Sequence, residues 1–289
     1  MIYKKAYAKI NLSLDVLSKR QDGYHNISTI MVKTDLYDEL FFDKNSKDTE
    51  IYGDFGFNKE KNIIYKAYQA ISLYIGKNLP IKVKVKKNIP MQAGLAGGTA
   101  DGAATLQAIN EIYSLNLTLK DLMKISEPLG ADFPFMLNNK NMKASGIGNI
   151  LSPCGSFLYP NVLIVNPGYG VSTPIVYNNL KLDEKRIKTD EIIRALNAYD
   201  YKFLSVNLAN KMEKFVFTEH KDLCYIKEKL RTFNGISLMS GSGPTIFAIF
   251  ERNKDLERAY KFYRNIYKNV FKVRAGDFYG NIWLKCRYN

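Results

Sequence analysis

The sequence predicts an α+β fold organised as two domains, on the evidence of its length and its hydrophobic spacing. With 289 residues, 46% of them hydrophobic, the chain can bury a sizeable core as one large or two ordinary domains. The alternation of apolar and polar residues that is typical of half-buried strands recurs between stretches with the three- and four-residue spacing of helices. Turn-forming residues near Ser152-Pro-Cys-Gly-Ser156 predict a boundary, so domains are expected at 1–153 and 154–289.

The N-terminal stretch is predicted to form β-structure in two segments. Over 2–17, apolar residues alternate with polar ones, which predicts a strand pair or one long strand, and a further strand is expected over 27–42. The alternation puts Lys9 and Asn11 on the face opposite the apolar side chains. On an ordinary strand that face meets water, which is the alternative to any functional role for Lys9.

A turn at Asp22-Gly23 is predicted to join these two strands. It leaves Tyr24 and His25 at the end of a loop, where a flat ligand could stack on an aromatic ring. Alternatively, the ring closes the edge of the core.

A glycine-rich segment lies between a predicted strand and a predicted helix. The strand, 81–86, alternates strictly and leads into residues 90–100, called here the glycine loop. Because Gly94, Gly97 and Gly98 lack Cβ atoms, the backbone can bring N–H groups close to an anion, and the following helix N-terminus favours negative charge. The loop therefore predicts a phosphate site, with an unliganded glycine turn as the alternative. Its spacing matches neither the P-loop nor the dinucleotide-binding pattern.

A carboxylate in an apolar turn is the next candidate. Helical spacing predicts a helix over 62–75, and a capping box from Thr118 to Asp121 predicts another. The second helix ends in Leu-Gly-Ala-Asp-Phe-Pro-Phe, which puts Asp132 between a glycine and a proline. A buried carboxylate needs partners, so the structural alternative is that Asp132 is a helix N-cap.

The C-terminal half continues the α+β pattern. A strand is expected over 162–165, and Thr173 is predicted to cap a helix that has Pro174 at its first position. A second glycine turn, residues 239–245, leads into another strand. The remaining predicted elements are helices over 190–198, 202–216 and 221–233, a helix around Leu256, and a closing strand near 270–275.

Composition limits the class of protein. The net charge of +14 comes from basic residues spread along the chain without a block of like charges, so lysine on the surface is favoured over nucleic-acid binding. Three separated cysteines argue against zinc and disulfides, and no stretch is long and apolar enough for a signal peptide or a membrane span. A cytoplasmic protein without membrane partners is expected; oligomeric state is left between monomer and weak homodimer.

Taken together, the motifs resemble those of the GHMP kinase family, in the same order along nearly the whole chain. The resemblance is carried by Ala8-Lys-Ile-Asn-Leu12, Asp22-Gly-Tyr-His25, Ile89 to Gly98, Leu129 to Pro134, Val171-Ser-Thr-Pro174 and Met239 to Gly243. It implies a two-domain fold: an N-terminal domain like ribosomal protein S5 domain 2 and a C-terminal ferredoxin-like α+β domain, with the active site in the cleft between them.

The resemblance also implies a mechanism. Lys9 and Asp132 are similar to the family's catalytic pair, in which the carboxylate accepts the proton of the attacking hydroxyl and the ammonium stabilises charge. ATP is the phosphoryl donor, with Mg²⁺ on its phosphates and no protein metal site. The expected ATP-binding residues are Asn62, Lys87, Pro90, Met91, Gln92, Ala93, Gly94, Leu95, Ala96, Gly97, Gly98, Thr99 and Ala100, and the phosphate-proximal turn is Ser240, Gly241, Ser242 and Gly243.

The Asp-Gly-Tyr-His element is similar to that of members acting on a cytidine diphosphate derivative of methylerythritol in non-mevalonate isoprenoid biosynthesis. The implied substrate-binding residues are Asn11, Tyr24, His25, Thr173 and Tyr177. The alternatives are a related kinase for homoserine, mevalonate or a sugar, or a basic nucleic-acid-binding protein. Four positions depart from the pattern. Ala100 replaces a loop serine, Ala96 stands where glycine is frequent, Gly102 where alanine is common, and Asn149 where an acidic residue is common.

Overall fold

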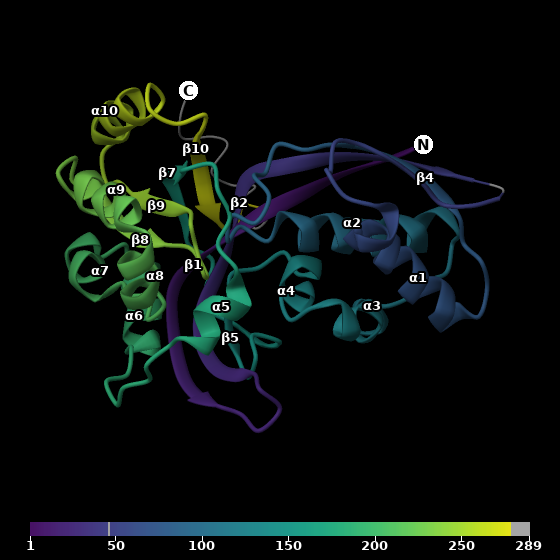
Figure 1. The fold of residues 1–289 in the computed structure, drawn as a ribbon, viewed down its shortest axis with the longest axis horizontal. Helices are drawn as coiled ribbons and strands as arrows, with labels where there is room; N and C mark the ends of the chain where they lie inside the picture. Colours follow the sequence, from purple (N-terminus) through teal and green to yellow (C-terminus); the bar gives the residue numbers. More distant parts are fainter. Residues whose placement is uncertain (46, 279–289) are drawn as a thin grey trace. The chain divides into compact units, whose positions relative to one another are not determined.

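The computed structural model describes residues 1–45 and 47–278, which pack as two compact units (Figure 1). The first unit consists of Met1–Ala8, Leu36–Met91 and Ala96–Asn138, and the second of the remaining described residues. The two units therefore alternate along the chain. The proposed division into domains 1–153 and 154–289 stays a prediction.

The first unit takes its strands from the start of β1 (Ile2–Lys19), the end of β2 (His25–Lys44), β3 (Glu50–Tyr52) and β4 (Ile81–Lys86). β4 pairs antiparallel with β2 from Glu39↔Lys86 to Lys44↔Ile81, and β3 pairs parallel with β4. The residues of β4 are alternately buried and exposed, with the lysines exposed, so the predicted half-buried strand is confirmed. The helices of this unit are α1 (Ile63–Ile75), α2 (Gly97–Ile112), α3 (Leu119–Ser126) and α4 (Phe133–Leu137), with single 3₁₀ turns at Lys59–Lys61 and Glu127–Leu129.

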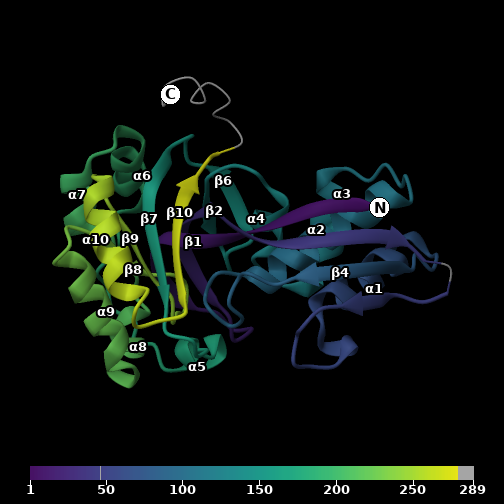
Figure 2. The same cartoon turned by 90° about the horizontal axis from the view of Figure 1, so that it is seen from above.

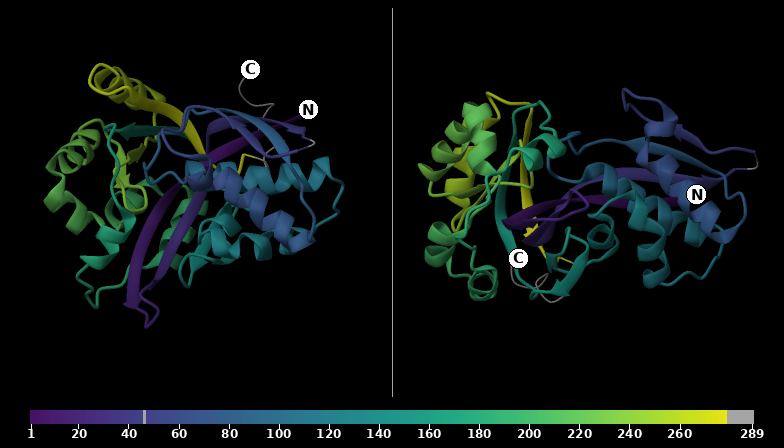
Figure 3. Two further views of the ribbon diagram at one scale, coloured as in Figure 1. Left: turned by 45° about the vertical axis from the view of Figure 1, so that its right-hand side comes forward. Right: turned by 60° about the horizontal axis from the view of Figure 1, so that its bottom comes forward.

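Local chemistry explains where these helices begin. The Asn62 side chain accepts the Ile64 N–H at 3.0 Å and caps α1, and Gly76 ends that helix with φ 70°. The predicted capping box of α3 is present, since Thr118 and Asp121 bond each other's backbone N–H groups. α1 and α2 lie side by side (Figure 3).

The second unit contains the start of β2, most of β1 (Ile2–Lys19), and a sheet in the order β10–β7–β9–β8. β7 (Leu158–Asn166) lies between β9 (Ile246–Ile249) and β10 (Asn269–Gly276), and pairs antiparallel with both. Figure 2 shows α7, α9 and α10 on one side of β7 and β10. The remaining elements are β5 (Met142–Ser145), β6 (Ile150–Pro153), α5 (Thr173–Asn178), α6 (Thr189–Ala198), α7 (Tyr201–Asn207), α8 (Glu213–Glu219), α9 (Lys221–Arg231), β8 (Ile236–Met239) and α10 (Asn253–Tyr263).

The prediction of one helix over 202–216 is wrong. The structure has α7 and α8 there, separated by residues 208–212. In this break, Ala209 and Lys211 bond the backbone of Leu14 on β1, at 3.0 and 2.9 Å. Tertiary hydrogen bonds therefore override a helical pattern in the sequence. Among the described residues no helix combines the length and the apolar character needed to cross a bilayer.

Candidate active site

Strand β1 places Lys9 and Asn11 in the interior of the second unit. Both are buried, with exposed fractions of 5% and 2%. The Lys9 ammonium donates to Asn11 Oδ1 at 2.6 Å, and Asn11 Nδ2 donates to the Thr29 hydroxyl at 2.8 Å. The alternative that this face of the strand meets water is wrong, because a buried ammonium requires hydrogen-bond acceptors and this one has them. Lys9 is thus a fixed, desolvated cation.

The two glycine turns meet beside this cation. The Ser240 hydroxyl donates to the Gly94 carbonyl at 3.0 Å, while the Asn11 N–H donates to Ser240 Oγ at 3.4 Å. A Cβ on Gly94 would lie 2.4 Å from the Ser240 carbonyl oxygen, and one on Gly241 would lie 3.7 Å from Lys9 Nζ. Gly94 also has φ 73°, which disfavours any side chain. The structure therefore brings together Lys9, Asn11 and both turns within the second unit.

Asn210 was missed by the sequence reasoning, although it holds the second glycine turn. Its side-chain amide donates to the carbonyls of Met239 and Gly241, both at 2.8 Å, and its Oδ1 accepts the Met212 N–H at 2.9 Å. Asn210 is buried. The only available signal was an asparagine, a poor helix former, in the middle of a predicted helix.

Thr173 contacts the second glycine turn but does not have the predicted capping role. Ser172 is the N-cap of α5 and Thr173 is its first helical residue, so the prediction of a Thr173 cap is wrong. The Thr173 hydroxyl instead pairs with the Ser242 hydroxyl at 2.7 Å. A capping bond therefore does not account for this side chain, and its role in binding substrate stays a prediction.

The predicted base-binding residues lie around the start of β2 and α5. His25 is buried and stacks on Tyr177, with ring centroids 5.1 Å apart and an angle of 25° between the planes. Tyr24 is 60% exposed. Burial, followed by the charge of Lys19, lowers the pKa of His25, so the imidazole is neutral near pH 7 and can both donate and accept a hydrogen bond.

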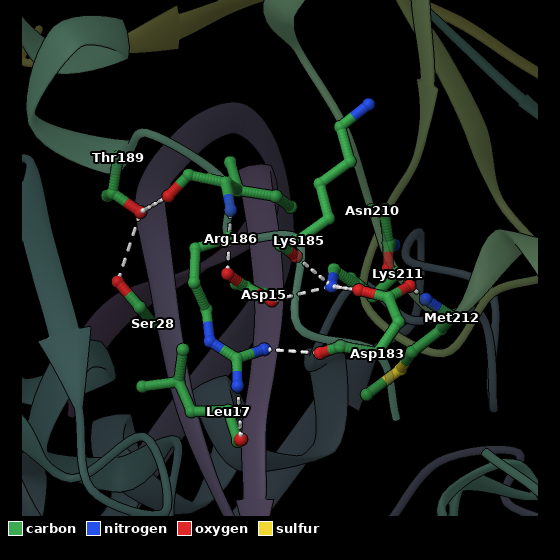
Figure 4. Close-up of polar contacts among 11 residues, drawn as sticks. Asp15, Leu17, Ser28, Asp183, Lys185, Arg186, Thr189, Asn210, Lys211 and Met212 are labelled. Atoms are coloured by element: carbon green, nitrogen blue, oxygen red, sulfur yellow. Dashed lines mark hydrogen bonds and ion pairs between the residues drawn. The ribbon is translucent and has the colours of Figure 1, made fainter. Parts of the chain in front are cut away.

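A charged cluster fixes the loop that follows α5 (Figure 4). The Lys211 ammonium binds Asp183 and the Lys185 carbonyl, and lies 3.6 Å from the buried Asp15 carboxylate. Asp15 also accepts the Ile187 N–H at 2.8 Å. These contacts tether residues 183–187 to β1, and so restrain the segment that connects α5 to α6.

In the first unit, the second half of the glycine loop opens α2. Ala96, the N-cap, has φ 53°, a left-handed conformation that costs about 1–2 kcal/mol outside glycine. Gly97 packs so tightly on Ile89 that a Cβ would lie 2.8 Å from it. Ala100 is buried, and Gly98 is exposed at the helix N-terminus. The N-terminus of α2 is thus exposed at Gly98, as the predicted phosphate site at a helix N-terminus requires.

Three further predicted residues lie in the same unit. Asn62 caps α1, as described above, and the Lys87 ammonium is bound by Asp38 and Asp101. Asp132 occupies the N-cap position of α4, but its side chain makes no capping hydrogen bond. The alternative that Asp132 is a helix N-cap is therefore confirmed for its position in the helix and wrong for the hydrogen bond. Lys9 and Asp132 fall in different units, and their pairing stays a prediction.

Two family models match this arrangement. The GHMP kinases N terminal domain matches residues 62–139, which contain the glycine loop and Asp132, and the GHMP kinases C terminal domain matches residues 191–269. Together they define a small-molecule kinase with the α+β fold that the sequence predicted.

Two relatives narrow the class further. The 4-diphosphocytidyl-2-C-methyl-D-erythritol kinase of Clostridium kluyveri is 38% identical over 94% of this chain and 99% of its own, and that of Acetivibrio thermocellus is 39% identical over 90% and 94%. A crystal structure of 4-(cytidine 5'-diphospho)-2C-methyl-D-erythritol kinase has a TM-score of 0.83 at 28% identity, covering 95% of this chain and 99% of that one. The L. major mevalonate kinase, at 15% identity, 96% coverage of both chains and TM-score 0.71, shares the fold alone. The chain belongs to the GHMP kinases and, within them, to the family of 4-diphosphocytidyl-2-C-methyl-D-erythritol kinases.

The role of Asn210 can be tested by Asn210→Ala. The substitution leaves two buried carbonyls and one N–H without a partner, which costs about 1–3 kcal/mol for a buried group left unsatisfied. We also expect kinase activity to fall about 10- to 100-fold, because the turn beside Lys9 shifts. Denaturant unfolding and steady-state kinetics measure the two effects.

The matched control is Asn207→Ala, three positions earlier, where the amide bonds only the Phe203 carbonyl of its own helix at 2.8 Å. Activity should stay near wild type in this variant. Equal losses in the two variants would show that Asn210 has no special role at the turn.

Proposed function

We propose that this chain transfers the γ-phosphoryl group of ATP to the 2-hydroxyl of 4-diphosphocytidyl-2-C-methyl-D-erythritol, giving the 2-phosphate and ADP in non-mevalonate isoprenoid biosynthesis. The observation that carries the proposal is the buried Lys9–Asn11 pair bonded at 2.6 Å beside the second glycine turn. The names of the relatives support the choice of substrate.

Asp132 and Lys9 are assigned the chemistry at the acceptor hydroxyl. The hydroxyl oxygen forms a bond to Pγ while the bond from Pγ to the bridging oxygen of ADP breaks, and the hydroxyl proton passes to the Asp132 carboxylate. The Lys9 ammonium stabilises the developing negative charge, which is most effective in a desolvated site. Asp132 is half-buried, and its side chain does not cap α4.

ATP is assigned to the glycine loop and the N-terminus of α2. Backbone N–H groups at Gly97 to Thr99 are among those with no partner inside the helix, and the helix dipole favours the phosphates there. Mg²⁺, when bound, neutralises phosphate charge; it prefers oxygen ligands and keeps several waters, so the Thr99 hydroxyl suits it without a dedicated protein cage.

The cytosine is assigned to Tyr24, His25 and Tyr177. A centroid separation of 5.1 Å leaves no room for a base between His25 and Tyr177, so the base stacks on the other face of Tyr177, with Tyr24 packing on the base. The neutral His25 ring supports Tyr177 and offers hydrogen bonds at its edge.

We also propose that the protein acts in the cytoplasm, as a monomer or weak homodimer without nucleic-acid or membrane partners.

The assay that tests this function measures ATP consumption with the cytidyl substrate, homoserine, mevalonate and methylerythritol phosphate in parallel. We expect turnover with the cytidyl substrate to exceed the others by at least about 100-fold in kcat/KM, because each alternative lacks the base and one or both phosphates. Comparable turnover of homoserine or mevalonate would overturn the assignment of the substrate.

The Asp132→Asn variant tests whether the Asp132 carboxylate accepts the proton of the acceptor hydroxyl. The amide keeps the shape of the side chain but cannot take the proton, so kcat should fall about 10²- to 10⁴-fold while calorimetry still detects ATP binding. Asp121→Asn is the matched control, since Asp121 is a half-buried capping residue in the same unit. Near-native kcat in the Asp132 variant would rule out the general-base role.

Tyr177→Ala tests the base stack. Loss of a stacking partner costs about 1–3 kcal/mol per base, so KM for the cytidyl substrate should rise roughly 5- to 100-fold with a smaller change in kcat. Tyr177→Phe keeps the ring and should retain a near-native KM. If the Ala variant lowers kcat at unchanged KM, Tyr177 does not bind the base.

A further inference from the structure

Lys211 lies in the charged cluster beside β1, entirely within the second unit (Figure 4). Its side chain is 15% exposed, and its ammonium bonds the Asp183 carboxylate and the Lys185 carbonyl and lies 3.6 Å from Asp15 Oδ1. The Asp15 side chain is 1% exposed, and a carboxylate so buried requires an opposite charge beside it. The Lys211 N–H also bonds the backbone of β1 at 2.9 Å. Lys211 therefore joins β1 to residues 183–187.

Residues 183–187, called here the tether, have further bonds to β1. Asp15 Oδ2 accepts a backbone N–H of the tether at 2.8 Å, and the Arg186 guanidinium donates to the Leu17 carbonyl at 3.2 Å. Asp15 and Leu17 are on β1, which pairs with β2, and β2 begins at His25. The tether is thus fixed to the strand pair that carries His25.

Helix α5 precedes the tether and carries Tyr177 near its C-terminal end. It has six residues, and four residues, 179–182, separate it from the tether. A helix of six residues is not stable by itself in water, so its surroundings fix its orientation. Val176 is its buried residue, and the Thr173 hydroxyl attaches its N-terminal end to the second glycine turn. The tether restrains its C-terminal end.

We propose that Lys211 is a positioning residue for the cytidine side of the site. By fixing the tether to the strands that carry His25, Lys211 keeps the Tyr177 ring stacked on His25, 5.1 Å away, and oriented toward the base. The inference rests on the proposed function in taking Tyr177 as the residue that binds the cytosine. Asn210, the preceding residue, bonds the second glycine turn, so adjacent side chains position two parts of the site.

The length of chain that the tether restrains gives the expected size of the effect. Beyond the tether, the next contact with β2 is made by Thr189, whose hydroxyl pairs with that of Ser28 at 3.1 Å. Without the tether, the free connection after α5 grows from four residues, 179–182, to ten, 179–188. The statistical weight of a closed loop falls as the 3/2 power of its length, so ordering α5 becomes roughly fourfold less favourable. The affinity for the cytidyl substrate should fall by a similar factor.

The experiment is calorimetric titration of the cytidyl substrate, without ATP, into wild type, Lys211→Gln and Lys214→Gln. We expect Kd to rise about three- to fivefold in Lys211→Gln, while the Kd for ATP changes by less than about 1.5-fold. Lys214→Gln removes the same charge from an exposed position on α8 and should follow wild type. Equal Kd values for the cytidyl substrate in Lys211→Gln and wild type would overturn the inference.

Asp183→Asn separates the tether from a direct effect of charge. If Lys211 only attracted the diphosphate, loss of this cation would weaken binding, whereas loss of the Asp183 charge would strengthen it. The tether predicts weaker binding in both variants, by about two- to threefold in Asp183→Asn because the Lys185 carbonyl still accepts from the ammonium. The Asp183 side chain is 54% exposed, so this variant leaves no buried charge unpaired and carries the test if Lys211→Gln does not fold. Unchanged or tighter binding in Asp183→Asn would contradict the tether.

A double variant tests whether Lys211 acts through Tyr177. In Tyr177→Ala there is no ring to orient, so adding Lys211→Gln should change Kd by less than about 1.5-fold. A merely structural role would multiply the two effects, so a further loss of about three- to fivefold would show that Lys211 does not position Tyr177. If wild type fails to bind the cytidyl substrate, the proposed function is refuted, and the inference with it. If wild type binds it and the variants bind equally well, only the inference fails.

Discussion

The hydrogen bond from the Ser240 hydroxyl to the Gly94 carbonyl is the contact on which the arrangement of the two glycine turns around Lys9 depends. It joins two turns that are 146 residues apart in sequence, and it requires that Gly94 have no side chain, because a Cβ would overlap the Ser240 carbonyl. The Asn11 N–H completes the link to β1, which also carries Lys9. The Ser240 hydroxyl therefore sets the position of Lys9 relative to both glycine turns.

Asn210 gives the second glycine turn further buried hydrogen bonds. Its amide bonds two carbonyls of the second turn, while the neighbouring backbone pairs with Leu14 on the strand that carries Lys9. The break between α7 and α8 thus supplies a buried donor that a continuous helix could not supply. Residues 208–212 do not form helical hydrogen bonds, and instead Asn210 bonds the second glycine turn.

How much the sequence could predict depended on the range of the interaction. Alternation along β4 and the capping box of α3 are local, and both predictions were confirmed. The kinase class was confirmed because its motifs keep fixed residue types at fixed spacing. The break at 208–212 and the partner of Thr173 depend on residues tens of positions away, so no local pattern could reveal them.

Lys87 shows the same limit at the level of charge. A lysine beside a phosphate loop suggests an ATP ligand, and the sequence alone offered no reason to count Asp38, 49 residues away, against it. In the structure two carboxylates bond the ammonium, and burial makes their separation from it costly. The role of Lys87 as an ATP ligand stays a prediction. The Lys9 ammonium also has a buried acceptor, Asn11 Oδ1, which lies on the same strand two residues further on. Hydrogen-bond acceptors thus fix the positions of both buried lysines, but only the acceptor of Lys9 is close to it in sequence.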